Sequence, residues 1–209
     1  MTARVAALVA AAALSACSLL PRAPAPSTRE GEWAAARDGA SCRAFLYDRF
    51  NHHATATATH LSLAVREARA RRLAEWLGWT PAELEARLVK ERQEAAAREE
   101  FLVAVFTADP HFNDLDAPRS NWRVALKVEG AALLPSRVTT IGRDAEVLGL
   151  FPYIGPFDVV YQVIVPMPQG GPIAGLPYVL EISSALGRLS LDFAAPGGPL
   201  MPQQPVPPP

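Results

Sequence analysis

The chain has 209 residues, of which 50% are hydrophobic and 20% are charged, a composition that suits one packed domain with appendages or two small domains. Its formal net charge is −1. This near-neutral balance excludes both the basic footprint of a nucleic-acid-binding protein and the polybasic segment that attracts anionic lipid, so we expect no nucleic-acid partner.

The first residues have the pattern of an export signal. Arg4 supplies a positive charge, an apolar run extends from Val5 to Leu14, and small residues follow. A charged start, a short apolar middle and small residues at the cut are typical of a secretory signal peptide. The run is shorter than the roughly 20 apolar residues that a bilayer-spanning helix needs. We therefore predict that residues 1–16 are a signal peptide.

The residues at the end of this segment are Leu14, Ser15, Ala16 and Cys17. They resemble the lipobox of bacterial lipoproteins at each position. The resemblance implies that signal peptidase II cuts between Ala16 and Cys17, and that the thiol of Cys17 carries a diacylglycerol, with a further acyl chain such as palmitate on the new amino terminus. Two or three acyl chains anchor a protein stably to a membrane. Ser18 stands where an aspartate would mark inner-membrane retention in the enterobacterial pattern, which favours the outer membrane, facing the periplasm. The alternative is an ordinary signal peptide with an accidental cysteine.

Residues 17–39 are predicted to be the lipidated cysteine and a flexible tether, since Pro21, Pro24 and Pro26 stand among small and charged residues. Cys42 is the second cysteine of the chain. If Cys17 is acylated, Cys42 has no intrachain partner, and we expect it to be buried like a small hydrophobe or paired between chains.

Residues 40–100 are predicted to be a helical region. The alternation of alanine and threonine from Ala54 to Thr59 favours a strand, but the strongly helical sequence that follows decides the prediction for helix. Apolar spacing predicts a helix over Leu61–Leu77, which Gly78 ends. Arg66 and its neighbouring arginines are placed mostly off the apolar face.

A second helix begins at Thr80-Pro81-Ala82-Glu83 and is predicted to reach Glu100. Threonine is the N-cap, proline occupies the first helical position, and Glu83 completes a capping box. Its apolar stripe is thin, so the two helices are predicted to form a hairpin that needs a partner surface.

The residue pattern changes at Phe101 from one typical of helices to one typical of strands. Short apolar or alternating runs separated by turn residues predict strands. The segment Phe101–Thr107 reads as a strand buried on both faces, and Val159–Val165 is predicted to be central. Other predicted strands are 122–128, 137–141, 178–183 and 188–193, with helical turns over 143–150. We therefore predict an α+β fold, an N-terminal helical hairpin packed on an antiparallel immunoglobulin-like β-sandwich over residues 101–193. This layout is similar to β-sandwich regions of uncharacterised bacterial lipoproteins, a resemblance that carries no function. Residues 194–209, rich in proline and glycine, are predicted to be a disordered tail.

Candidate sites are few. His52, His53 and His60 could bind a metal ion, but their spacing is not that of HExxH, and no carboxylate completes a site. The aspartates from Asp109 to Asp116 suggest calcium, but the EF-hand pattern fails, and short aspartates in such connections usually cap local backbone. No phosphate-binding glycine loop or GxSxG elbow occurs in the sequence. We therefore predict no catalytic residue, no metal and no cofactor.

The exposed aromatic residues are the remaining feature. Trp76 and Trp79 flank the helix turn, and Phe151, Tyr153 and Phe157 crowd a proline-bounded turn. We expect them to pack the helices onto the sheet, with a recognition patch for a protein partner as the alternative.

The prediction for function is a lipid-anchored cell-envelope lipoprotein that acts as a non-enzymatic interaction or assembly module, held to the membrane through Cys17. The alternatives are a periplasmic small-ligand or metal-binding protein and, third, a hydrolase with a dispersed site.

Overall fold

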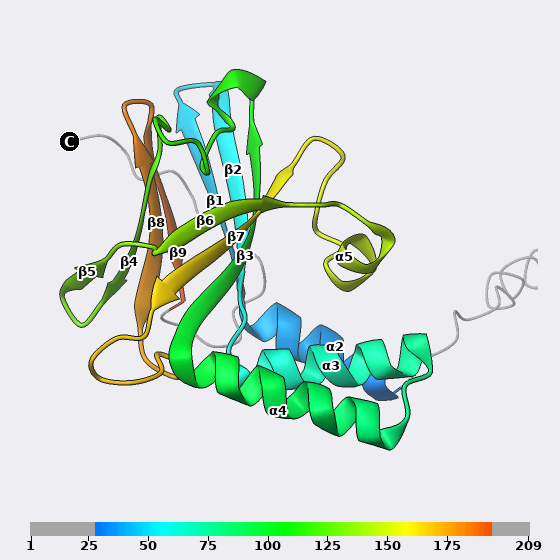
Figure 1. The fold of residues 1–209 in the computed structure, drawn as a ribbon. Coiled ribbons are helices and arrows are strands. Elements are labelled where there is room, and N and C mark those ends of the chain that lie inside the picture. The colour runs from blue at the N-terminus through cyan, green and yellow to red at the C-terminus, as the bar shows by residue number, and fades with distance from the viewer. Residues whose placement is uncertain (1–27, 194–209) are drawn as a thin grey trace, which may run out of the picture.

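The computed structural model describes residues 28–193, which form two antiparallel sheets with helices gathered mainly at one end of them (Figure 1). The fold is therefore α+β, as predicted. The five-stranded sheet has the order β1-β2-β3-β7-β6 and the four-stranded sheet the order β5-β4-β8-β9. The strands are β1 (Ser41–Asp48), β2 (Asn51–His60), β3 (Arg98–Thr107), β4 (Arg123–Val128), β5 (Ala131–Leu133), β6 (Arg137–Ile141), β7 (Val159–Pro166), β8 (Tyr178–Ser184) and β9 (Gly187–Asp192). The helices are α2 (Thr28–Gly39), α3 (Leu63–Leu77), α4 (Pro81–Ala97) and α5 (Ala145–Leu150), with a short 3-10 helix, η2 (Pro110–Phe112).

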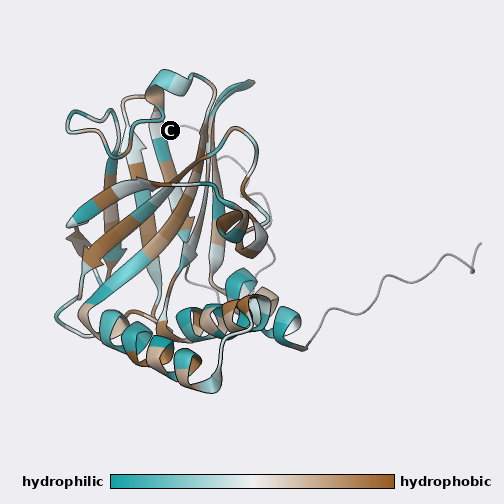
Figure 2. Ribbon diagram, turned by 45° about the vertical axis from the view of Figure 1, so that its right-hand side comes forward, coloured by the Kyte–Doolittle hydropathy of each residue, from teal (hydrophilic) through white to brown (hydrophobic). Residues whose placement is uncertain are grey.

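The main core lies between the two sheets. It combines Phe101, Val103 and Val105 of β3 with Leu180 and Ile182 of β8, all fully buried. Hydrophobic and hydrophilic residues are interspersed along several strands of the two sheets (Figure 2). On β3 the run from Phe101 to Phe106 is apolar throughout, as expected of a strand that is covered on both faces. The prediction of a strand buried on both faces at Phe101–Thr107 is confirmed, since only Arg98 and Phe106 of β3 are half-exposed.

A second core covers part of the outer face of the five-stranded sheet. Leu102 and Ala104 of β3 contribute from the sheet, Val65 and Leu73 from α3, and Phe151 from the segment after α5. The two clusters together bury β3 on both sides. β3 is the middle one of the five strands in this sheet, and the strand at Val159–Val165, predicted to be central, is an inner strand beside it, between β3 and β6.

The helical prediction for residues 40–60 is wrong. These residues form the hairpin of β1 and β2, and β2 also pairs with β3 from Ala54↔Thr107 to His60↔Phe101. Ala54, Ala56 and Ala58 point into the core at 0% exposure, and the threonines between them face the other way. Ladder hydrogen bonds on both sides of β2 outweigh the mild helical preference of alanine.

The prediction of a tether is wrong for residues 28–39, the part of 17–39 that the structure describes. Residues 28–39 form α2, in which the Trp33 side chain is 1% exposed. Its indole Nε1–H donates to the Leu150 carbonyl at 3.0 Å, and its ring meets Phe151 edge to face at 5.5 Å. The buried indole, the hydrogen bond from Arg37 to the Leu150 carbonyl at 3.3 Å and the ion pair of Glu30 with Arg72 of α3 hold this helix in the fold. Residues 17–27 lie outside the described part of the chain, as do the predicted signal peptide and the predicted tail.

The predicted helix boundaries around residue 80 are confirmed. Gly78 adopts the left-handed conformation with a φ of 65° and ends α3. Thr80 Oγ1 accepts the Glu83 N–H at 3.3 Å, and the Thr80 N–H donates to Glu83 Oε2 at 2.7 Å, which is the predicted capping box. The second helix ends at Ala97 rather than Glu100, because β3 begins there. Among residues 28–193, no helix is long and apolar enough to span a bilayer.

Ion pairs join α3 to α4 where apolar contacts are few. Within α4, only Leu88 and Glu91 are buried. Arg66 of α3, predicted to lie off the apolar face, is 1% exposed. Its guanidinium donates to Glu91 Oε2 at 3.0 Å, to Glu100 Oε2 at 2.6 Å and to the Leu61 carbonyl at 2.7 Å. The charged face of α4 is thus partly a buried ion network that fixes the helices to the start of β3.

Candidate interaction surface

The half of the outer sheet face that the helices leave uncovered carries a row of aromatic rings. Phe45 stacks on Tyr47 with ring centroids 6.3 Å apart, Tyr47 contacts His52 at 4.9 Å, and His52 stacks on Phe106 at 5.4 Å. These residues come from β1, β2 and β3 in spatial order. With Phe157, which is 78% exposed, they form a surface that we call the aromatic face.

Strand periodicity explains why the rings share one side of the sheet. On β1, Ala44 and Leu46 are buried in the main core, so Phe45 and Tyr47 between and beyond them point outward. On β3, Val105 is in the core and Phe106 is half-exposed. The register changes between Leu46 and Tyr47, where Tyr47 pairs with His52, and this irregularity sets the His52 ring beside Phe106.

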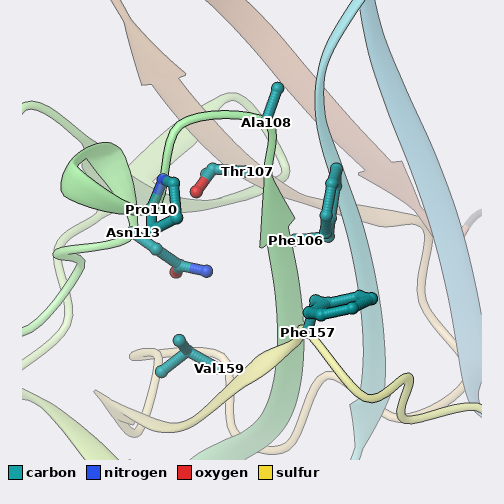
Figure 3. Close-up of a pocket in the computed structure, with 7 residues that line it drawn as sticks. All are labelled: Phe106, Thr107, Ala108, Pro110, Asn113, Phe157 and Val159. Carbon is teal, nitrogen blue, oxygen red and sulfur yellow. The ribbon is translucent and has the colours of Figure 1, made fainter.

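A groove continues from Phe106 toward Phe157 (Figure 3). Its volume is about 480 Å³, and no charged side chain lines it. The lining residues are Phe106, Thr107, Ala108, Pro110, Asn113, Phe157 and Val159. The groove exists because the β3–β7 pairing ends at Val105↔Val159, so the last residues of β3 extend past the start of β7.

Asn113 fixes the polar wall of the groove. Its Nδ2 donates to the Val105 carbonyl at 2.8 Å, and its Oδ1 accepts the Tyr161 hydroxyl at 2.9 Å. Burial raises the pKa of Tyr161 to about 12, so this hydroxyl remains a donor at neutral pH. With both its amide nitrogen and its amide oxygen hydrogen-bonded, Asn113 shapes the groove rather than reacting in it. The arrangement suits binding of an apolar or ring-shaped group by contact and stacking.

The three predicted histidine candidates do not come together. His52 and His53 lie at one end of β2, and His60 lies at the other, about 25 Å away at the usual rise of a strand. His52 is part of the aromatic face, and its Nε2 lies 2.7 Å from Thr55 Oγ1.

His60 is 2% exposed and lies in a buried polar chain. Its Nε2 is 2.7 Å from Glu99 Oε2, and its Nδ1 is 2.7 Å from the Tyr178 hydroxyl. Glu99 accepts the Ile173 N–H at 2.8 Å through its other oxygen. Burial, with the nearby charges of Glu99 and Cys42, raises the pKa of Tyr178, so its hydroxyl stays protonated. Both ring nitrogens of His60, both carboxylate oxygens of Glu99 and the Tyr178 hydroxyl have partners within this buried group. These side chains therefore form a structural link between β2, β3 and β8.

The aspartates of the predicted calcium loop accept hydrogen bonds from separate groups instead of converging on one site. Asp109 Oδ1 accepts the His111 N–H at 3.0 Å, and Asp114 Oδ1 accepts the Ser120 hydroxyl at 3.0 Å. Asp116 Oδ2 reaches a different strand, where it accepts the Thr140 N–H at 3.1 Å. Within residues 28–193, no group of three or more His, Cys, Asp or Glu residues could hold a metal ion.

Of the two cysteines, the structure describes Cys42. Cys42 is half-buried against the main core, and burial raises the pKa of its thiol. This agrees with packing as a small hydrophobe. Cys17, the predicted lipidation site, and Ala16 before it lie outside the described residues.

The predicted aromatic cluster divides into two groups. Phe151 and Tyr153 pack the helices against the sheet, where the Tyr153 hydroxyl lies 2.7 Å from Thr59 Oγ1. Trp79 packs at the edge of the same cluster, and Trp76, 40% exposed, stacks under Arg72 at 4.5 Å. Phe157 alone belongs to the aromatic face. Phe45, Tyr47 and Phe106 were not predicted to be part of a site, although the i, i+2 spacing of the first two is a strand signal.

Comparison with known proteins identifies no relative that bears on function. No protein-family model matches the chain, and no curated protein sequence matches it. A solved structure, described as a novel protein of unknown function from Burkholderia pseudomallei K96243, is similar with a TM-score of 0.43 and 10% sequence identity. The similarity covers 78% of this chain and 82% of that one.

Proposed function

We propose that the protein is a lipid-anchored cell-envelope lipoprotein that acts as a non-enzymatic interaction module, and that the aromatic face is its docking surface. The observation that carries the proposal is the row of rings on a sheet held rigid by two cores. The lipobox at Leu14–Cys17 supports the anchor and the outer-membrane, periplasm-facing location.

Aromatic side chains suit recognition because each presents a large contact area at a low cost in conformational entropy. Truncation of such an anchor typically costs 2 kcal/mol or more of binding free energy. Phe157, at 78% exposure, contributes little to folding and has most of its ring area available to a partner. The groove beside Phe157 has no charged side chain in its lining, so the expected partner is an envelope protein with an apolar segment.

We also propose the finer architecture in which the two sheets form an immunoglobulin-like sandwich, in the loose sense, and α3 and α4 form a helical hairpin that covers it. Support comes from the core shared by both sheets and from the second cluster, to which both Val65 and Leu73 of α3 and Leu102 of β3 belong. A cover at this end leaves the opposite end, with the aromatic face, free for binding.

The test is crosslinking in membranes that carry the full-length protein. We expect Phe157→Ser to lose most of the crosslinked partner, while its free energy of unfolding changes by less than about 0.5 kcal/mol because the ring is exposed. Leu77→Ser is the matched control, since Leu77 is 59% exposed at the end of α3 and distant in the fold from the groove. Equal crosslinking by both variants and the native protein would reject the aromatic face as the docking surface.

A small-ligand-binding protein is the second candidate, favoured by the groove of about 480 Å³. Calorimetry of the purified protein with envelope extracts fractionated below the size of a protein distinguishes the two. Saturable heat that Phe157→Ser abolishes would favour the small ligand. A metal-dependent rise in melting temperature would favour an ion site, and activity on model esters would favour the hydrolase alternative.

A further inference from the structure

Residues 194–209 contain a regular proline repeat. Prolines occupy every third position: Pro196, Pro199, Pro202, Pro205 and Pro208. A polyproline II helix has three residues per turn and rises 3.1 Å per residue, so residues three apart lie along one edge, about 9 Å apart. The repeat would therefore present a continuous edge of proline rings. Pro207 and Pro209 fall outside this register.

The aromatic face has the chemistry that such an edge requires. Proline-rich segments in the polyproline II form dock on grooves lined by aromatic rings, which contact the proline rings. The centroid spacings along the row are 6.3, 4.9 and 5.4 Å, so about two turns of the helix cover it. The groove between Phe106 and Phe157 extends the contact by a further turn. The segment from Ala194 to Pro209 has no charged residue, which matches a groove with no charged lining.

The described chain ends at Phe193, which packs on Phe101 and Tyr178 at the helix-covered end of the sheets, so the remaining segment must run along the sheet to meet the aromatic face. The Phe193 N–H donates to the Tyr178 carbonyl at 2.9 Å, and the Asp192 backbone hydrogen-bonds the Cys42 thiol near the start of β1. β1 is the edge strand of its sheet, with β2 as its one partner in the sheet order. Phe45 is three residues beyond Cys42, or about 10 Å along the strand. A segment of residues 194–209 in the polyproline II form spans about 50 Å, enough to cross this edge and follow the row of rings.

We propose that residues 194–209 dock on the aromatic face of their own chain, with the Pro196 to Pro208 register against the rings. This inference rests on the proposed function, because it names the chemistry of the partner that the same face accepts: a proline-rich segment that must displace the chain's own. Covalent attachment to the same chain holds the segment at an effective concentration on the order of 1 mM. Even a weak contact is then occupied until a stronger partner competes.

The experiment measures binding of a synthetic peptide of residues 194–209 to the full chain carrying Cys17→Ser, which removes the predicted lipid site. One variant replaces Pro199, Pro202 and Pro205 by alanine in the register. The matched control replaces Pro207 and Pro209, which lie outside it. For a peptide Kd of ~0.1 mM, competition from the attached segment weakens peptide binding about tenfold. We therefore expect the in-register variant to bind the peptide about tenfold more tightly than either the parent or the control, and Tyr47→Ala in that variant to abolish binding.

Equal peptide affinity for the three proteins, or no binding to the in-register variant, would overturn the inference. So would a dimer that dissociates when the in-register prolines are replaced, because the occupant would then come from a second copy. If peptide binding fails while Phe157→Ser still loses its crosslinked partner, the docking segment is wrong and the proposed function stands. If the peptide binds as expected but Phe157→Ser keeps its crosslinked partner, the docking segment is correct and the proposed function is wrong.

Discussion

Replacing Arg66 by methionine should destabilise the protein more than most single substitutions. Arg66 is 1% exposed and donates to Glu91, Glu100 and the Leu61 carbonyl. Methionine fills similar space and leaves two carboxylates, themselves 2% and 4% exposed, short of a partner. Removal of one partner from a buried ion pair typically costs ~3–5 kcal/mol, because the other charge stays buried without compensation.

The remaining contacts place the expected value at the lower end of that range. Glu91 keeps Arg69 at 3.2 Å and Arg87 at 2.7 Å. Glu100 keeps Gln162 at 2.7 Å and a longer contact with Arg98 at 3.7 Å. We expect a loss of about 3 kcal/mol in the free energy of unfolding, or about 10 °C in melting temperature for a domain of this size.

Urea denaturation of the full chain measures the loss, and Glu100→Gln provides the second arm of a double-mutant cycle. The double variant should be more stable than the sum of the single losses predicts, by ~2 kcal/mol, since it removes both charges. A loss below ~1 kcal/mol for Arg66→Met, or strictly additive effects, would refute the claim that this network fixes the helices to β3.

Arg66→Met should also change how the stability of the protein responds to mild acid. Burial by itself raises the pKa of Glu100, but the Arg66 charge and the hydrogen bonds from Gln162 and Arg66 hold it below the ordinary value of 4.5. A pKa lower in the folded state gives stability that is present above pH 4.5 and is lost as the pH falls through the folded value. Without Arg66, burial dominates and the ionised carboxylate destabilises the fold at neutral pH. Mild acid should then stabilise Arg66→Met while it leaves the native protein unchanged.

Three further predictions test other parts of the chain. Thr80→Ala should cost about 1 kcal/mol in a denaturant titration through loss of the α4 cap, and Thr80→Ser, which keeps the hydroxyl, should cost much less; an unchanged midpoint for the alanine variant would contradict the capping role. Trp33→Ala should cost ~3–5 kcal/mol if α2 belongs to the folded unit, whereas a tether would lose nothing measurable. Cys17→Ser should leave the membrane fraction and lose its acyl mass in intact-mass analysis, and a lipid-free native protein with another N-terminus would contradict the lipobox assignment.

Local chemistry explains what could be predicted from the sequence. The left-handed Gly78, the Thr80 cap and Glu83 lie within a few residues of one another, and each prefers its conformation almost independently of the rest of the fold. The later strands were also predictable, because alternation against turn residues is a short-range signal. Asp109 caps nearby backbone as expected, whereas Asp116 accepts the N–H of Thr140 on a different strand.

Pairing between distant segments explains what could not be predicted. The alternation at Ala54–Thr59 was visible, but its stability depends on β1 and on β3, which is more than forty residues later in the chain. Burial of Arg66 in α3 likewise depends on its ion pair with Glu100 in β3, and the whole of α4 separates the two residues along the chain. The aromatic face exists only when three strands align in register, so no single segment of sequence contains its signal.

The placement of α3 and α4 also affects how quickly the sheet can form. β2 and β3 are neighbours in the sheet, yet residues 61–97 separate them along the chain. Bringing the ends of a long flexible segment together has an entropic cost that grows with its length. Helices that form early convert most of this segment into two rigid rods whose free ends lie close together, because α3 and α4 return the chain to where it left the sheet (Figure 1). The caps at Gly78 and Thr80 therefore influence the rate at which the central strands meet, and a loss of the Thr80 cap should slow folding more than it accelerates unfolding.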